Sequence, residues 1–359
     1  MALAAKKIII KFAKMLIGKR RMDCILYGLK NMNQFTSLAG HEGMLADSVR
    51  VEGYYRGIQR NVRPGDIVVD LGTGTGILSF FASKRNPEKI YAIDHSPFIS
   101  IAQAVARNNS IENIEFVRMH SKEFSPEEKV DVILHEQLGA FLFNENMIEN
   151  LLDLKKRVLK PSGRILPAKF ELFVEPIVLK EEFRIPFLWE REIHGIDFSF
   201  LKNHLDLGQY KKSDYLFKSR RNLEIDYLMA EPDPILFLDL NEIVSEEEIP
   251  RSFTARRSVV RSGVIDGYCM YFRVIFDEEI SFDNSPVNRQ TNWWNVVFRC
   301  ERRKYNVGDM IHYTFHMEDL ANANLWYVKT EDDVRSGAQV QIQKRQESIS
   351  SKLHSIRVL

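Results

Sequence analysis

The sequence predicts an α/β protein in which a parallel, doubly wound sheet is followed by a second half of antiparallel strands. Three observations lead to this expectation. In the first half, short apolar runs alternate with helical segments, as in folds where each strand is followed by a crossover helix. A glycine-rich run at 72–76 follows the first apolar run and opens a helix. Beyond Pro167 the helical pattern fades and strand-like segments replace it.

The elements of the first half follow from hydrophobic periodicity and from helix and turn signals. Upstream, residues 22–62 are mostly helical in pattern, and Asp47 or Ser48 is suited to cap a helix that passes Arg50 towards Ile58. Turns are expected at Pro64-Gly65 and at Pro161-Ser162-Gly163. Strands are expected at 66–71, 89–94, 114–119, 130–134 and 164–166, and helices at 77–84, 99–108 and 149–158.

The second half has few helical signals. Its strand-like segments lie at 169–179, 235–240, 270–276 and 293–300. Residues 189–227 are charged, aromatic and irregular, which indicates an insertion or a projecting arm. The chain is therefore divided into a basic N-terminal helical segment (1–34), a cofactor domain (35–167), a β domain (168–336) and a polar tail (337–359).

Composition places the chain among folded globular proteins. It has 359 residues, of which 45% are hydrophobic and 28% charged, and its net charge is +1, so no polyelectrolyte partner is implied. Cys24, Cys269 and Cys300 are isolated and lack metal-ligand spacing, so we expect a cytoplasmic protein without a structural metal. No apolar run approaches transmembrane length.

The N-terminus is basic and amphipathic. Lys11 and Lys14 interrupt its apolar residues, so a secretory signal peptide is not expected. One alternative is a helix that lies on an anionic membrane or a nucleic acid. The other, which we favour, is a helix packed on the domain with its lysines in water.

The glycine run indicates a cofactor site. Gly72, Gly74 and Gly76 allow the backbone to approach a ligand closely and place amides at a helix N-terminus. Asp94 lies eighteen residues after Gly76, at the end of the next strand, where a carboxylate can accept hydrogen bonds from ribose hydroxyls. Its alternative role is to cap the turn at Ser96-Pro97. At this point NAD and S-adenosylmethionine both fit, and the absence of a second nicotinamide-side pattern favours the latter.

Two glutamates frame an apolar loop after the strand at 130–134. Glu136 and Glu145 are nine residues apart in the segment HEQLGAFLFNENM, and almost nothing else between them is charged. An acidic pair around an apolar loop at a strand end suits the binding of a cation. The plainer alternative is a pair of loop carboxylates that face water or lysine.

Four motifs in this order resemble the protein arginine methyltransferase family, over roughly residues 35–333. GHEGMLADSVR at 40–50 resembles the family's N-terminal helix segment, and DLGTGTGILSFFA at 70–82 its cofactor loop. HEQLGAFLFNENM at 135–147 resembles its double-glutamate loop, with the same nine-residue interval. TNWWNVVF at 291–298 resembles the C-terminal loop whose usual core is THW.

The resemblance implies a Rossmann-like class I methyltransferase domain, then an antiparallel β-barrel domain with an inserted dimerisation arm at 189–227. It implies S-adenosyl-L-methionine as cofactor and a homodimer formed through the arm. Residue by residue, it implies that Arg50 pairs with the cofactor carboxylate. The other cofactor-binding residues that it implies are His41, Met44, Asp70, Gly72, Gly74, Gly76, Asp94 and Glu123, and the substrate-pocket residues are Phe35, Met147, Asn292 and Trp293.

The resemblance also implies a reaction in which Glu136 and Glu145 are catalytic. A guanidinium is a poor nucleophile because its lone pairs are delocalised and its pKa lies far above neutral pH, so it stays protonated. Two carboxylates that bind it can localise the charge on one nitrogen and leave another aimed at the methyl group. One carboxylate can also accept the released proton.

The chain departs from the family pattern around the acceptor. Asn292 replaces the usual histidine and cannot take a proton. Both tyrosine positions of the N-terminal segment are lost, and Phe35 keeps only a ring. Lys122 stands at the usual adenine-side acid, with Glu123 one residue on. Gln137-Leu138 and Ala140 replace a Trp-Met pair and a tyrosine.

These departures keep two alternatives open. The first is methylation of another small-molecule amine or hydroxyl. The second is a catalytically weak methyltransferase-like subunit that acts through a partner. The acceptor, a protein or a small molecule, is not identified by the sequence.

Overall fold

The computed structural model describes residues 37–143, 145–204 and 217–330. Contacts within the chain divide it into two compact units. The first unit comprises the chain up to Glu136 together with Asp153–Leu166. The second unit comprises Gln137–Leu152 together with the chain from Pro167 onwards. The domain boundaries that we drew from the sequence stay predictions.

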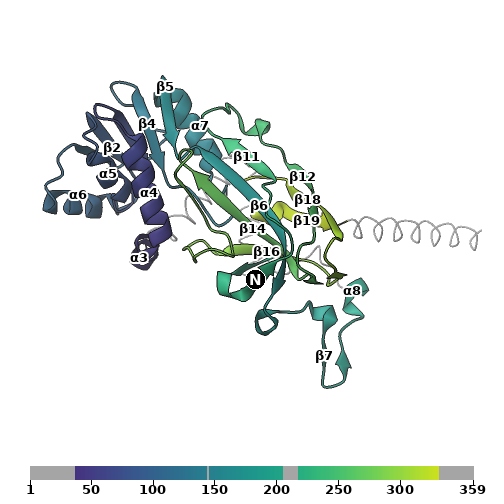
Figure 1. The fold of residues 1–359 in the computed structure, drawn as a ribbon. Helices are drawn as coiled ribbons and strands as arrows, with labels where there is room; N and C mark the ends of the chain where they lie inside the picture. Colours follow the sequence, from purple (N-terminus) through teal and green to yellow (C-terminus); the bar gives the residue numbers. More distant parts are fainter. Residues whose placement is uncertain (1–36, 144, 205–216, 331–359) are drawn as a thin grey trace, which may run out of the picture. The chain divides into compact units, whose positions relative to one another are not determined.

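The first unit is built on a five-stranded parallel sheet with the strand order β3-β2-β1-β4-β5. Figure 1 labels β2, β4 and β5 of this sheet. From β1 the chain moves outward through β2 and β3, then returns to the other side of β1 with β4 and β5. The strands are β1 (Ile67–Leu71), β2 (Lys89–Ile93), β3 (Ile114–Val117), β4 (Val130–His135) and β5 (Leu159–Leu166), and the intervening helices are α5 (Ile77–Ser83), α6 (Ile99–Asn108) and α7 (Met147–Val158).

The reversal of strand order places two loops side by side. In the register of β1 and β4, Leu71 pairs with His135, so both strands end at the same edge of the sheet. Open α/β sheets bind ligands at this switch point. The glycine run follows Leu71 and Glu136 follows His135, so the fold itself brings these two motifs together.

The predicted elements of this unit are confirmed, with one exception. Pro161-Ser162-Gly163 does not form a turn before the last strand, because these residues lie within β5. The pairing shifts here, since Val130 pairs with Leu159 and Val132 with Arg164. Three extra residues of β5 are thus accommodated in an irregularity, which Pro and Gly tolerate at an edge strand.

Within the described residues, two helices precede the sheet, and each begins at a polar cap. In α3 (Leu38–Ala46) the Ser37 side chain accepts a hydrogen bond from Gly40 N, at 3.1 Å. In α4 (Ser48–Asn61) the Asp47 carboxylate accepts one from Arg50 N, also at 3.1 Å. These bonds satisfy amides that have no partner within the helix. The expected cap at Asp47 is therefore confirmed.

The second unit is an antiparallel β-barrel fold. One sheet has the order β10-β6-β14-β16-β9, with β11 on β6 and β15 on β14, and a three-stranded sheet has the order β12-β18-β19. Its strands are β6 (Lys169–Leu179), β9 (Phe217–Arg220), β10 (Ile225–Leu228), β11 (Leu236–Asp239), β12 (Ser252–Ser258), β13 (Gly263–Val264), β14 (Gly267–Ile275), β15 (Ser281–Asp283), β16 (Asn295–Arg299), β17 (Lys304–Tyr305), β18 (Met310–Met317) and β19 (Trp326–Thr330).

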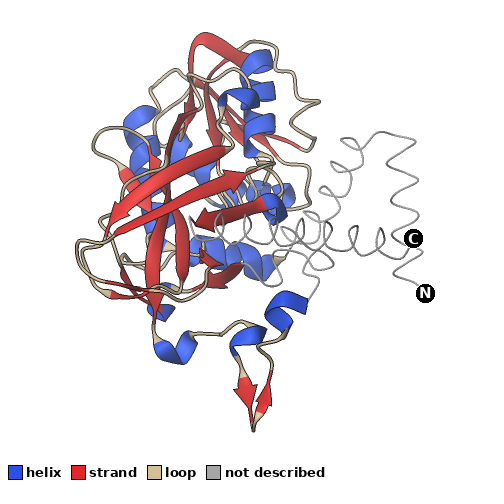
Figure 2. Ribbon diagram, turned by 90° about the vertical axis from the view of Figure 1, so that its right-hand side faces the viewer, coloured by secondary structure: helices blue, strands red, loops and turns tan. Residues whose placement is uncertain are grey.

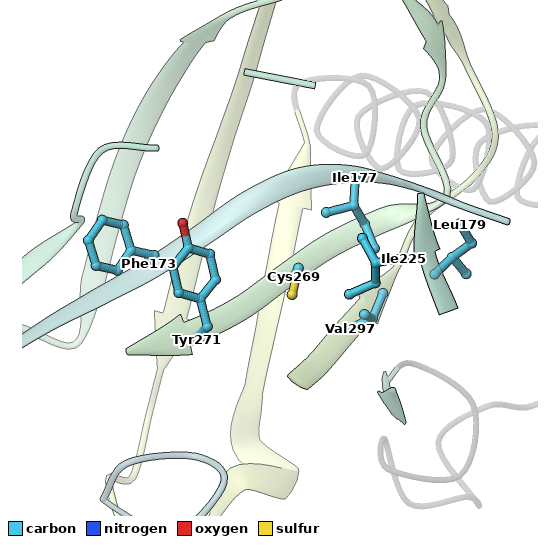
Figure 3. Close-up of a cluster of buried hydrophobic side chains, with 7 residues drawn as sticks. All are labelled: Phe173, Ile177, Leu179, Ile225, Cys269, Tyr271 and Val297. Atoms are coloured by element: carbon cyan, nitrogen blue, oxygen red, sulfur yellow. The ribbon is translucent and has the colours of Figure 1, made fainter. Parts of the chain in front are cut away.

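The long strands β6 and β14 carry the core of this unit. They pair over nine positions, from Gly267 opposite Ile177 to Ile275 opposite Lys169. Buried side chains from these and neighbouring strands form one apolar cluster (Figure 3). Within it, the rings of Phe173 and Tyr271 are stacked with centroids 4.8 Å apart. The cluster comprises Phe173, Ile177, Leu179, Ile225, Cys269, Tyr271 and Val297.

A short hairpin extends from the second unit within the predicted arm (Figure 2). It consists of β7 (Glu192–Ile193) and β8 (Ile196–Asp197), and α8 (Leu201–His204) follows it. Later parts of the 189–227 range belong to the barrel, since β9 pairs with β16 and β10 with β6.

Some sequence predictions fall outside the described residues. These are the basic segment 1–34, Phe35, residues 205–216 of the arm, and the tail 337–359. Within the part of the chain that is described, no helix is both long and apolar enough to cross a membrane.

Candidate active site

The glycine run forms a tight loop between β1 and α5. Its amides at Gly72 and Thr73 donate to the carbonyl of Ile93 at the end of β2, at 2.9 and 3.0 Å. Gly74 has a φ of +53°, and a Cβ there would lie 2.9 Å from Cε1 of His41. Only glycine combines this left-handed backbone with so close an approach. The loop therefore brings the backbone against the α3 histidine.

Asp70 stabilises this loop by hydrogen bonds made inside the protein. Its side chain is fully buried, and Oδ2 accepts hydrogen bonds from Thr73 Oγ1 at 2.7 Å and from Ser79 Oγ at 2.6 Å and N at 3.1 Å. Oδ1 is buried and accepts no hydrogen bond from a described residue. Burial raises the pKa of this carboxyl above its ordinary value, against the opposing effect of its hydrogen bonds. Asp70 thus shapes the cofactor loop from inside the protein.

Asp94 stands at the end of β2 with both carboxylate oxygens engaged by backbone amides. Oδ2 accepts from Gly74 N at 2.8 Å, and Oδ1 accepts from Ser96 N at 2.7 Å. Both roles that the sequence left open are therefore compatible with this position. The carboxylate caps the turn at Ser96, and it also adjoins the glycine loop with lone pairs left for further donors.

The α3 residues meet this loop from the other side. His41 is 8% exposed, and its ring centroid lies 3.9 Å from that of Phe98. Met44 is half-buried one turn later on the same helix. The structure thus brings His41 to the glycine loop, and it adds Phe98, which the sequence gave no reason to select.

Arg50 reaches the double-glutamate segment. Its Nη2 donates to Oε2 of Glu136, and the two side chains are 13% and 15% exposed. Arg50 lies on α4 and Glu136 immediately follows β4, so this ion pair joins residues 86 positions apart within the first unit. The sequence did not predict it, because the resemblance assigned Arg50 only to the cofactor carboxylate.

The loop after Glu136 belongs to the second unit, where three of its large apolar residues are buried. Leu138, Leu142 and Phe143 are at most 3% exposed, whereas Glu145 is half-buried. Leu142 has a φ of +61° and its amide donates to the carbonyl of Gly139 at 2.9 Å, which closes a tight turn. Met147 begins α7 and is fully buried, so it supports the loop from inside.

Two tryptophans of the barrel hold this loop. The indole Nε1 of Trp293 donates to the carbonyl of Leu138 at 2.6 Å. Trp293 is 7% exposed and packs against Phe272 and Phe282. Trp326 makes edge contacts with Phe141 and Phe143, with centroids 5.5 and 6.3 Å apart. Trp293 was expected at the substrate pocket, but Trp326 was missed because no motif surrounds it.

The remaining predicted residues are exposed. Asn292 precedes Trp293 and is exposed to solvent. Glu123 is also exposed and lies in a short segment after β3. Arg157 fixes that segment, since it donates to the carbonyls of Ser121 at 2.8 Å and Phe124 at 2.6 Å. The sequence offered no signal for this role, since Arg157 is one of several basic residues at the end of a helix.

Comparisons with known proteins agree with this architecture. A family model for ribosomal protein L11 methyltransferase (PrmA) matches residues 55–168. Protein arginine N-methyltransferase 6 of Xenopus tropicalis is 30% identical over 292 residues, which cover 77% of this chain and 83% of the relative. The Danio rerio protein of the same name is 29% identical over 297 residues, or 78% and 81% of the two chains.

Solved structures show the same fold. A Trypanosoma brucei PRMT1 enzyme–prozyme heterotetrameric complex with AdoHcy matches with a TM-score of 0.68 and 23% identity, over 79% of this chain and 89% of that one. Arabidopsis thaliana protein arginine methyltransferase 10 matches with a TM-score of 0.65 and 22% identity, over 79% and 89%.

Proposed function

This chain belongs to the protein arginine N-methyltransferase family, and we propose that it methylates a guanidino group held by Glu136 and Glu145. It is a methyltransferase that depends on S-adenosylmethionine. The acceptor that we propose is a protein arginine or an arginine-like small molecule. The observation that carries this proposal is the guanidinium–carboxylate pair of Arg50 and Glu136, beside the glycine loop at the sheet's switch point.

The residues around the glycine loop fit S-adenosylmethionine. When bound, this cofactor supplies an electrophilic methyl group on a sulfonium. The glycine loop, which packs closely against His41 at Gly74, presents its backbone amides at the N-terminus of α5. Asp94 presents a carboxylate at the end of β2, the next strand. Arg50 offers a guanidinium suited to a carboxylate ligand. These residues would hold the cofactor's two ends, and the buried Asp70 would keep the loop in shape.

Glu136 is suited to bind a guanidino acceptor. Its carboxylate already accepts a hydrogen bond from one guanidinium, that of Arg50, in a site with little solvent. Each carboxylate oxygen has two lone pairs, so Glu136 can accept further N–H donors from an acceptor. With Glu145 as the second carboxylate, the acceptor's positive charge would be held away from the nitrogen that attacks.

Charge-neutral substitutions test the proposed clamp. We expect Glu136→Gln and Glu145→Gln each to lower the rate of methyl transfer by about a hundredfold or more, because a glutamine cannot localise the positive charge or accept a proton. Cofactor binding, measured by calorimetry, should be retained. The matched control is Glu149→Gln, which removes one charge from the first turn of α7 and should keep near-normal turnover. Normal turnover in both clamp variants would contradict the proposal.

A second candidate is methylation of another small-molecule amine or hydroxyl. It is favoured by the exposed Asn292 and by Ala140, which stand where the family carries histidine and tyrosine. Radiolabelled cofactor, supplied with either arginine-rich peptides or a metabolite extract, separates the two candidates. Label on peptide arginine supports the guanidino acceptor, and label only on a small molecule without a guanidino group supports the second candidate.

We further propose that the protein forms a homodimer through its arm and acts in the cytoplasm. Apolar side chains are unusually exposed on the arm, where Ile193, Ile196 and Phe200 are 44%, 64% and 60% exposed. Such exposure is typical of an interaction surface. Among the described residues, Cys269 and Cys300 form no disulfide bond, which favours a reducing compartment. Cell fractionation tests the location, and the dimer is tested below.

A further inference from the structure

Asn222 lies in the barrel shortly after β9, at the start of η4 (Asn222–Glu224). Its side chain and amide make four hydrogen bonds to one segment, residues 285–295. The backbone N–H donates to Gln290 Oε1 at 2.7 Å, and Nδ2 donates to the carbonyls of Ser285 at 3.0 Å and Asn288 at 2.8 Å. Oδ1 accepts from Asn295 Nδ2 at 2.6 Å.

The same segment continues by hydrogen bonds to the double-glutamate loop. Gln290 Nε2 donates to the carbonyl of Thr291 at 2.7 Å, and Thr291 Oγ1 donates to the carbonyl of Trp293 at 3.0 Å. The Trp293 indole then donates to the carbonyl of Leu138 at 2.6 Å. Leu138 is two residues after Glu136 in the chain.

Several of these hydrogen-bonding residues are buried, so water cannot replace their partners. Thr291 and Ser285 are 4% and 5% exposed, and Asn295 is fully buried at the start of β16. Asn295 pairs there with Arg220 of β9, directly before η4. A buried polar group that loses its hydrogen-bond partner is destabilising, so removal of the Asn222 side-chain amide would disturb several groups at once.

We propose that Asn222 is a positioning residue of the methyl-transfer reaction. It fixes segment 285–295 against the start of η4, so that Trp293 holds the loop that follows Glu136. The inference rests on the proposed function for its effect on catalysis, but the mechanical link to the loop can be measured without turnover. Asn222 touches no reacting group and acts only through Trp293.

The test compares Asn222→Ala with a matched control, Asn306→Ala, at an exposed turn of the same unit. For Asn222→Ala we expect kcat to fall about tenfold, because small displacements of catalytic groups slow the reaction strongly. The KM for S-adenosylmethionine should be unchanged, since no cofactor residue is altered. Hydrogen exchange of the amides in 138–143, including that of Leu142, should be faster. The control should change none of these.

A double variant tests the route through Trp293. Trp293→Phe keeps the ring packing but removes the donor to Leu138. If Asn222 acts through this indole, the pair Asn222→Ala and Trp293→Phe should be no slower than Trp293→Phe alone. Multiplied rate losses in the double variant would overturn the proposal. Unchanged exchange at 138–143 in a folded Asn222→Ala protein would overturn it as well.

Two further outcomes are decisive. If Asn222→Ala does not fold, Gln290→Ala takes its place, because Gln290 is exposed. Its loss removes the hydrogen bond from Asn222 N and the hydrogen bond to the carbonyl of Thr291. The same expectations then apply to Gln290→Ala, and wild-type exchange at 138–143 would overturn the proposal. If the wild-type protein methylates no guanidino acceptor while Asn222→Ala still speeds exchange at 138–143, the mechanical link stands and the proposed acceptor is wrong.

Discussion

At the scale of single residues, Asp70 shows how the structure refines a sequence motif. The motif resemblance assigned it to the cofactor site, and it does lie in β1, the strand that precedes the glycine loop. Its carboxylate nevertheless lies inside the protein, where one oxygen accepts three hydrogen bonds from Thr73 and Ser79. Any effect of Asp70 on the cofactor is therefore exerted through the shape of the loop.

The pH dependence of stability tests this description of Asp70. Because burial raises the folded-state pKa of Asp70, the folded protein holds this proton more tightly than the unfolded chain. The contribution to stability is fully present below the ordinary pKa of about 3.8 and is lost as the pH rises through the folded value. Asp70→Asn does not titrate. We expect its free energy of unfolding, relative to wild type, to increase as the pH rises above the ordinary carboxyl pKa of about 3.8.

Urea unfolding monitored by circular dichroism measures this difference. The control is Asp226→Asn, which removes an exposed carboxylate from β10 and should show no such trend. A difference between Asp70→Asn and wild type that stays constant with pH would contradict the prediction.

At the scale of elements, a buried ion pair links β6 and β12. Because one of its charged residues occupies a buried position of β12, the hydrophobic pattern of the sequence marks β12 only weakly as a strand. Arg257 Nε and Nη2 donate to the two carboxylate oxygens of Glu175 at 2.7 and 2.9 Å, and the residues are 5% and 0% exposed. In β12 the buried positions are Ala255 and Arg257, and only Phe253, which is partly buried, adds a large apolar side chain, so apolar alternation marks the strand weakly. This is why 252–258 was not predicted as a strand.

Breaking this pair should destabilise the second unit strongly. Arg257→Met leaves the Glu175 carboxyl buried without its cation, which costs about 3–5 kcal/mol of unfolding free energy. The double variant Glu175→Leu with Arg257→Met should recover most of that loss, because two apolar side chains replace two desolvated charges. All four tryptophans of the chain lie in the second unit, so their fluorescence in denaturant measures this unfolding. Equal instability of the single and double variants would refute this explanation.

At the scale of the whole molecule, the arm exposes apolar side chains that no other described part of the chain covers. The hairpin β7–β8 and the residues after it expose apolar side chains that the second unit does not bury. Apolar surfaces of this kind are usually covered by a partner. A second copy of the chain is the partner that we propose.

Charged substitutions on the arm test this assembly. Ile196→Asp with Phe200→Asp should convert a dimer into a monomer in sedimentation at micromolar concentration, because carboxylates would be buried without partners. The control, Val244→Asp, alters an 80% exposed apolar residue outside the arm and should leave the dimer intact. A wild-type protein that sediments as a monomer would itself rule out the proposed dimer.

The sequence alone determined the order of strands and helices in the first unit, because periodicity, caps and glycine turns are local signals. It also predicted candidate site residues in the glycine loop, at Asp94 and at the glutamates that flank the apolar loop, since these stand in or beside local motifs. Only the tertiary structure decided how these motifs are supported. Arg50 with Glu136, Trp293 with Leu138 and Arg257 with Glu175 join residues 86, 155 and 82 positions apart. Such contacts depend on packing between distant elements, and no local pattern encodes them.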